Sequence, residues 1–149
     1  MDTLQFTVDI NAPADRVWST MLDQETYREW TGAFHEGSRY TGGWNLGDEI
    51  RFVGAEDEGP ESGMLGKIVA NRPNEFVSIE YTGQIEDGVD DTTSEFAEKL
   101  IGCHENYSFR EHDGITTVTV EVDSIDEFTE MFQEMWPPAL AALKAIAER

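Results

Sequence analysis

The amino-terminal part of the chain contains an unbroken alternation of apolar and polar side chains, Leu4-Gln5-Phe6-Thr7-Val8-Asp9-Ile10. A period of two residues is typical of a β-strand that buries one face. The next residues, Asn11-Ala12-Pro13, offer a polar cap and a proline suited to the first turn of a helix. Apolar residues then follow at helical spacing at positions 17, 18, 21 and 22. This stretch therefore predicts a strand over residues 4–10 and a helix from Pro13 to Leu22.

The chain between this helix and residue 123 predicts one more short helix and a series of antiparallel strands. Asp23 can cap a helix from Glu25 to Trp30, in which Tyr27 and Trp30 fall three residues apart on one side. Beyond it, short alternating runs are separated by Gly, Pro, Asn and Asp, the pattern of an antiparallel meander. The predicted strands cover residues 38–44, 49–53, 63–71, 76–82, 103–111 and 116–123.

The last part of the chain predicts a long amphipathic helix from Asp126 to Glu148. Its apolar residues recur every three or four positions, and they are Phe128, Phe132, Trp136, Leu140 and Leu143. Pro137 and Pro138 interrupt this pattern. A proline pair removes two amide donors and disfavours helical geometry at the preceding residue, so we expect a kink or a break there.

Acidic residues dominate the composition. The 149 residues include 31 Asp and Glu against 10 Lys and Arg, which gives a formal net charge of −21. Much of the acid falls in two stretches, 56–61 and 86–98, which we expect to be solvated and mobile loops. The ten basic residues are scattered singly, so binding of nucleic-acid phosphates or of an anionic membrane surface is disfavoured.

Length and residue types narrow the class of protein further. A chain of 149 residues with 39% hydrophobic residues can form one domain with a real core, and we expect residues 1–149 to be that domain. No stretch approaches the roughly 18 apolar residues needed to span a bilayer, and the amino terminus does not resemble a signal peptide, which predicts a cytoplasmic protein. Cys103 is the single cysteine, and the three histidines lack the i, i+4 spacing of a metal-binding pair. The sequence therefore predicts neither a metal site nor a cofactor.

Aromatic residues are the most informative candidates for a function. Seven of them stand in segments that converge between a curved sheet and the last helix: Trp30, Trp44, Phe52, Tyr81, Tyr107, Phe132 and Trp136. Such residues can fill a core or line a cavity for an apolar ligand, and the pattern alone leaves both open.

Glu105 is the one carboxylate that the strand pattern associates with these aromatic residues. It shares a strand face with Tyr107 and Phe109, so it points inward if Phe109 does, and it then needs a partner or a hydrated cavity. The opposite face, with His104 and Asn106, is the other choice for the inner one, and Glu105 also lies near the expected end of the strand. These alternatives stay open at this point.

Four stretches of the sequence, in order, resemble one known family. They are Ile10-Asn11-Ala12-Pro13-Ala14-Asp15-Arg16-Val17-Trp18, Asn45-Leu46-Gly47-Asp48-Glu49-Ile50-Arg51-Phe52, Gly66-Lys67-Ile68-Val69 and Trp136-Pro137-Pro138-Ala139-Leu140-Ala141-Ala142-Leu143-Lys144. The family is the one related to the carboxy-terminal domain of the activator of the heat-shock-protein-90 ATPase, within the START-like (SRPBCC) superfamily. The resemblance implies an α+β helix-grip fold, in which a curved antiparallel sheet of about seven strands, two short helices and a long carboxy-terminal helix enclose a cavity. Different members of the superfamily hold lipids, sterols, polyketides or other aromatic molecules in this cavity.

Three functions follow from this resemblance together with the candidate residues. The first is binding of a small hydrophobic or aromatic ligand by the seven aromatic residues, with Glu105 or a tyrosine hydroxyl group at its polar end. The second is a cyclase-like or hydrolase-like enzyme in which Glu105 acts as general acid or base. The third is a module that binds a chaperone or another protein partner through its acidic surface. An edge strand or an apolar face of the last helix also leaves a homodimer open.

Overall fold

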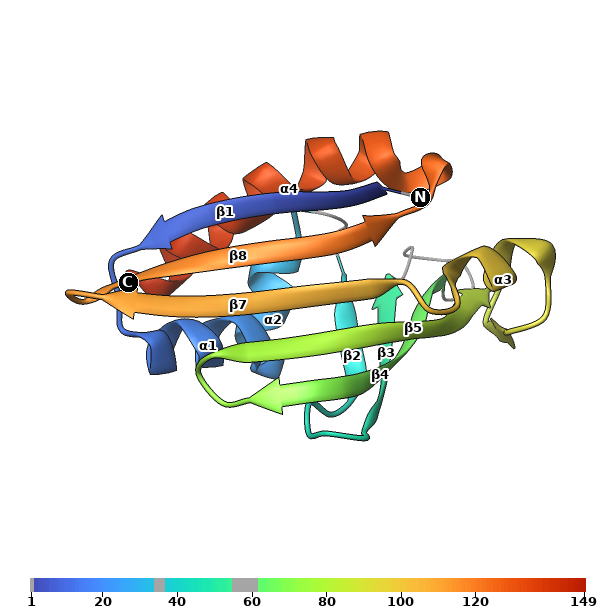
Figure 1. The fold of residues 1–149 in the computed structure, drawn as a ribbon, viewed down its shortest axis with the longest axis horizontal. Helices are drawn as coiled ribbons and strands as arrows, with labels where there is room; N and C mark the ends of the chain where they lie inside the picture. Colours follow the sequence, from blue (N-terminus) through green and yellow to red (C-terminus); the bar gives the residue numbers. More distant parts are fainter. Residues whose placement is uncertain (1, 34–36, 55–61) are drawn as a thin grey trace.

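A curved antiparallel sheet and a long carboxy-terminal helix dominate the fold (Figure 1). The computed structural model describes residues 2–33, 37–54 and 62–149. The elements in chain order are β1 (Asp2–Ile10), α1 (Ala14–Leu22), α2 (Gln24–Thr31), β2 (Arg39–Gly42), β3 (Glu49–Gly54), β4 (Ser62–Arg72), β5 (Phe76–Glu86), β6 (Val89–Asp91), α3 (Glu95–Leu100), β7 (His104–His112), β8 (Ile115–Ser124) and α4 (Asp126–Ala147). The predicted α+β fold, with a strand, two short helices, a meander and a final helix, is confirmed.

The sheet has the strand order β1-β8-β7-β5-β4-β3-β2, with β6 paired to β5. The chain begins and ends at opposite ends of the molecule (Figure 1). The alternation that predicted the first strand is present in the structure, because Leu4, Phe6, Val8 and Ile10 pack toward the core while the residues between them are exposed. Two register shifts in β4, after Leu65 and after Ile68, interrupt its pairing with β5, and such irregularities bend a sheet.

Helix α4 lies against β1, α1 and α2. Of the two predicted alternatives, a kink or a break, the break is wrong, because α4 continues through Pro137 and Pro138. The two missing amide donors would have served the carbonyl groups of Gln133 and Glu134, which belong to exposed residues and are therefore within reach of water. The preceding residue, Trp136, is 2% exposed, so its tertiary packing outweighs the local preference against helical backbone.

The acidic stretch 86–98 is mostly exposed to solvent as predicted, but the prediction of a loop is wrong, because the stretch contains β6 and most of α3. Strand β5 extends to Glu86 instead of ending at residue 82, and β6 pairs with it. The Asp91 carboxylate accepts hydrogen bonds from the backbone N–H and hydroxyl groups of Ser94, and Ser94 caps α3 by accepting from the Ala97 amide at 3.1 Å. Local capping and the burial of Leu100 therefore stabilise a segment whose composition suggests a loop. The other predicted loop, 56–61, lies outside the described residues.

Strand β2 ends at Gly42, two residues earlier than predicted, because Gly42 has a φ of +97° that takes the chain out of the extended conformation. A Cβ atom at this position would lie 2.2 Å from the backbone oxygen of Glu49. We expect Gly42→Ala to lower the free energy of unfolding by about 1–3 kcal/mol, measured by urea denaturation.

Gly47 provides the matched control, since it has a φ of +88° and no atom within 4 Å of an added Cβ. Gly47→Ala should therefore lower the free energy of unfolding by only about 1 kcal/mol, the cost of placing an alanine in the left-handed conformation. Equal losses of unfolding free energy in the two variants would show that the close approach of residue 42 to the Glu49 backbone has no effect on stability.

Candidate functional site

A cavity of about 350 Å³ lies between α2, the sheet and α4. Seven of the eight residues predicted to bind a ligand line it: Trp30, Phe52, Tyr81, Glu105, Tyr107, Phe132 and Trp136. They come from five separate elements, α2, β3, β5, β7 and α4. Six of the seven predicted aromatic residues therefore converge on the space between the sheet and the last helix.

Trp44 is the predicted residue that lies elsewhere. Its side chain lines a separate pocket together with Leu22 and Tyr40. Its ring still contacts the rings of Phe52 and Tyr107, with centroids 5.9 and 6.3 Å apart. Trp44 thus supports the cavity wall from behind.

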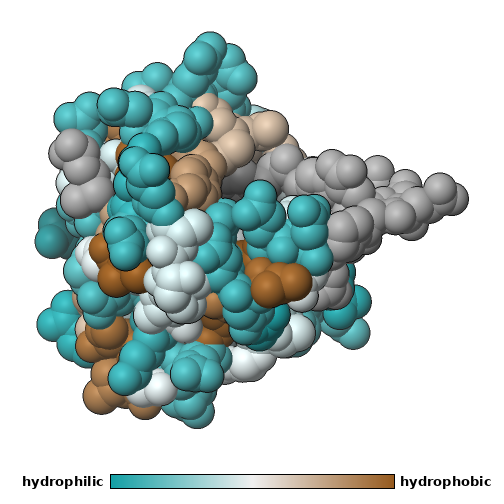
Figure 2. All heavy atoms as spheres, turned by 90° about the vertical axis from the view of Figure 1, so that its right-hand side faces the viewer, coloured by the Kyte–Doolittle hydropathy of each residue, from teal (hydrophilic) through white to brown (hydrophobic). Residues whose placement is uncertain are grey.

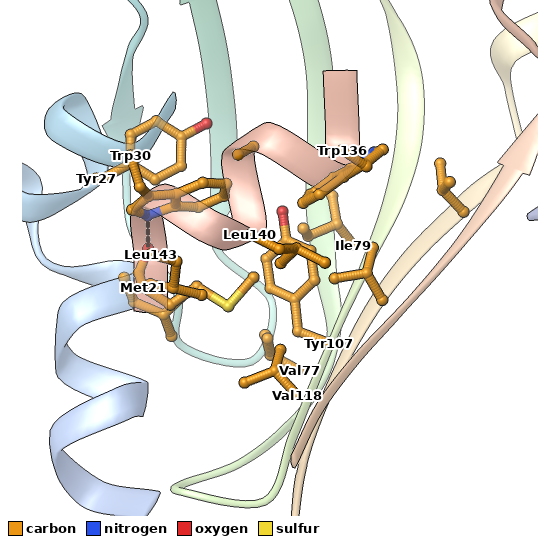
Figure 3. Packing of buried hydrophobic residues seen from close by; sticks show 14 of the residues in the cluster. Met21, Tyr27, Trp30, Val77, Ile79, Tyr107, Val118, Trp136, Leu140 and Leu143 are labelled. Atoms are coloured by element: carbon orange, nitrogen blue, oxygen red, sulfur yellow. Dashed lines mark hydrogen bonds between the residues drawn. The ribbon is translucent and has the colours of Figure 1, made fainter. Parts of the chain in front are cut away.

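Six aromatic residues form a closed series of ring contacts, which we call the aromatic cluster: Tyr27, Trp30, Trp136, Tyr107, Trp44 and Phe52. Successive ring centroids around the series lie 5.3, 6.0, 6.1, 6.3, 5.9 and 6.3 Å apart. All of them except Trp44 line the cavity. Figure 3 shows Tyr27 and Trp30 on α2, Trp136 on α4, and Tyr107 extending from the sheet with its hydroxyl group directed toward α4.

Glu105 points into the cavity from β7. It pairs with Ile79 on β5 and with Val122 on β8, and both of these residues are fully buried. The choice left open by the sequence is thereby decided: the inner face carries Glu105 and Tyr107, and the face with His104 and Asn106 is the outer one. Glu105 as a residue is only 7% exposed.

Two tyrosine hydroxyl groups hold the Glu105 carboxylate. Tyr81 donates to one oxygen, Oε1, at 2.7 Å, and Tyr107 donates to the other, Oε2. Within the described ranges, these hydroxyl groups are its only hydrogen-bond partners, and no Lys, Arg or His forms an ion pair with it. Glu105 is therefore a buried carboxylate with hydrogen-bond donors but without a neighbouring positive charge.

Burial determines the electrostatics of this group. It raises the pKa of Glu105, whereas the hydrogen bonds from Tyr107 and Tyr81 act in the opposite direction. Burial and the negative charge of Glu105 together raise the pKa values of Tyr27, Tyr81 and Tyr107 well above their ordinary range. The three phenols therefore stay protonated at neutral pH and remain available as donors.

Tyr27 lines the cavity although the sequence did not single it out as a binding residue. It is 7% exposed, and its hydroxyl group forms no hydrogen bond to any residue that the structure describes. Its helical spacing from Trp30 was the signal that could have identified it. Met131 and Met135 on α4 also line the cavity, and the apolar pattern of the last helix did not distinguish them.

Other kinds of site find little support in the described part of the chain. No three His, Cys, Asp or Glu side chains come together there in a way that could hold a metal ion. None of the described helices is long and apolar enough to cross a membrane. Figure 2 shows that hydrophilic residues cover most of the face at the α3 end, with hydrophobic residues in separate groups between them.

The chain is similar in sequence to one protein family. The family model for Activator of Hsp90 ATPase homolog 1-like protein matches residues 11–148. A comparison with curated proteins finds no match.

Solved structures with the same fold come from several bacteria. The Aha1 dimer from Colwellia psychrerythraea, solved in solution, is 16% identical, with a TM-score of 0.71 over 99% of this chain and 97% of that one. Protein MLL2253 from Mesorhizobium loti is 13% identical, with a TM-score of 0.72 over 97% of this chain and 96% of that one. DynU16, from the dynemicin biosynthetic locus, is 15% identical with a TM-score of 0.70; the match covers 99% of this chain but 48% of DynU16, so this chain spans about half of its length.

Proposed function

The chain belongs to the Activator of Hsp90 ATPase homolog 1-like family, and from this fold and its interior we propose that the cavity binds a small hydrophobic or aromatic molecule. The observation that carries the proposal is the cavity itself, which lies between sheet and helix and has five rings of the aromatic cluster in its wall. A volume of about 350 Å³ falls within the range of small-molecule sites.

The cavity combines apolar walls with few polar groups, which suits recognition of a mainly apolar ligand. Trp30 and Trp136 offer indole faces from two different helices. Phe132 and Met135 extend this surface along α4. The polar groups that face the same space include the Tyr27 hydroxyl group and the Glu105 carboxylate, which can orient a ligand.

A neutral fluorescent probe tests this proposal. N-phenyl-1-naphthylamine should bind with saturable enhancement of its fluorescence, and Phe132→Ala should weaken that binding about tenfold, because the variant removes one aromatic wall. Phe132 is only partly buried, so this change spares the fully buried core. Affinities are measured by titration at constant protein concentration.

Phe128→Ala is the matched control. Phe128 is also partly buried and lies on α4 one turn before Phe132, and the centroids of the two rings are 5.7 Å apart. Phe128 does not line the cavity, however. Its variant should bind the probe within about twofold of the unmodified protein. Absence of saturable binding, or an equal loss in both variants, would contradict the proposal.

A further inference from the structure

Among the described residues, no Lys, Arg or His forms an ion pair with the Glu105 carboxylate. Arg39 on β2 lines the same space, but the hydrogen bonds to the two Glu105 oxygens come from Tyr81 and Tyr107. The other titratable groups that face Glu105 there are the phenols of Tyr27, Tyr81 and Tyr107, which are neutral at neutral pH. A buried carboxylate is costly unless a proton or a cation accompanies it, so a cationic ligand would relieve the same cost that protonation of Glu105 relieves.

The residues around Glu105 are of the kind that stabilise an organic cation. The faces of Trp and Tyr rings carry negative electrostatic potential and attract ammonium groups, most strongly where water is excluded. Tyr27, Trp30, Tyr107 and Trp136 contact one another around the cavity from α2, β7 and α4. A single carboxylate among such rings therefore offers a cation both ion pairing and ring faces.

The Glu105 carboxylate retains capacity for a further partner. Its two oxygens accept one hydrogen bond each from the described residues, whereas a carboxylate offers about four lone-pair positions. The Tyr27 hydroxyl group, which has no partner among the described residues, lines the same space. The net charge of −21 adds a long-range field that favours cations and disfavours anions.

We propose that the ligand of this cavity is an organic ammonium ion with an apolar or aromatic body, whose positive group lies against Glu105 and the aromatic cluster. The inference rests on the proposed function, since it specifies the ligand class of the same cavity. Trp30 and Trp136 contact the apolar body, and Glu105 selects the charge.

Two probes of equal shape test the inference, phenyltrimethylammonium and tert-butylbenzene, because they differ by one positive charge. Binding of each is followed by tryptophan fluorescence, since Trp30 and Trp136 line the cavity. The unmodified protein should bind the cation at least about tenfold more tightly than the neutral probe. Glu105→Gln should reduce this preference to about twofold or less. Far-ultraviolet circular dichroism, which should match that of the unmodified protein, shows that the variant is folded.

The outcomes separate the two proposals. Equal or tighter binding of tert-butylbenzene by the unmodified protein would overturn the inference and leave the proposed function standing. Binding of neither probe would overturn both. A cation preference that persists in Glu105→Gln would overturn the role of Glu105. Suppression of that remaining preference by 1 M NaCl would attribute it to net charge, and its persistence in salt would attribute it to the ring faces.

A pH titration of the unmodified protein tests the inference without a variant. Among the described groups that face Glu105, the phenols of Tyr27, Tyr81 and Tyr107 stay neutral in the acidic range, so the titration follows the charge of Glu105. Affinity for phenyltrimethylammonium should fall as the pH decreases through the pKa of Glu105, whereas affinity for tert-butylbenzene should stay constant. A parallel fall of both affinities would contradict the inference.

Discussion

Replacing Leu143 with alanine is expected to lower the free energy of unfolding by about 2–5 kcal/mol. Leu143 is 0% exposed on α4, where this helix packs against α1 and α2. Figure 3 shows its side chain next to Met21 of α1. Removal of three carbon atoms from such a position costs both the transfer free energy and the cavity that remains. Urea denaturation followed by far-ultraviolet circular dichroism measures the loss.

Gln133→Ala on the same helix is the control for this experiment. Gln133 is exposed, and the substitution removes no buried contact, so its effect should stay within about 0.5 kcal/mol. A loss below about 1 kcal/mol in Leu143→Ala would mean that α4 is not anchored through this residue. It would also contradict the view that α4 forms a fixed wall of the cavity.

Hydrophobic periodicity predicted most of the fold because the two-residue period of the strands and the helical period of α4 each continue over many residues. The alternation before Ile10 identifies one buried face of β1, and the apolar stripe from Phe128 to Leu143 identifies one buried face of α4. Both elements are held in the fold by burial of that face. The stretch around β6 and α3 escaped prediction, because its stability comes from Asp91 and Ser94 and not from a repeated apolar pattern. In the same way, the packing of Trp136 overrides the helix-breaking tendency of the following prolines.

The site was predictable to the extent that it uses core positions. Six of the seven predicted residues that line the cavity are aromatic, and they meet there because α2 and α4 cover the inner face of β3, β5 and β7. The orientation of Glu105 was undetermined, because alternation defines two faces of a strand without saying which is inner. Pairing with Ile79 and Val122 decides it, and this is tertiary information. The displacement of Trp44 has the same origin, since β2 ends at Gly42 and leaves Trp44 outside the strand.

Stability and function make different demands on Glu105. Its burial raises its pKa above that of an exposed glutamate, so the folded state holds this proton more tightly than the unfolded state. Stability associated with Glu105 is then greatest below the unfolded pKa and decreases as the pH rises through the folded pKa. A residue that destabilises its own fold at neutral pH is the kind that a bound cation would stabilise.

The double variant Tyr81→Phe/Tyr107→Phe is expected to lose about 3 kcal/mol or more of unfolding free energy at pH 8. Each substitution removes a hydroxyl group that donates to the Glu105 carboxylate, and hydrogen bonds to a charged group are among the stronger ones. The phenyl rings remain in place, so packing is largely preserved. Tyr27→Phe is the control, because its hydroxyl group forms no hydrogen bond within the described residues, and its variant should change stability by about 0.5 kcal/mol or less.

The pH dependence of this loss distinguishes the charge of Glu105 from a packing defect. The two hydrogen bonds lower the pKa of Glu105, so their removal raises the folded pKa further above the unfolded one. The loss relative to the unmodified protein should therefore be complete above the folded pKa of the variant, and it should shrink as the pH falls from that value to the lower folded pKa of the unmodified protein. Below that point both proteins carry a neutral Glu105, and only the weaker neutral hydrogen bonds, about 1 kcal/mol, separate them. A loss that is the same at pH 8 and at pH 4 would show that the hydroxyl groups act through packing, and Glu105 would then not be held as a carboxylate in the cavity.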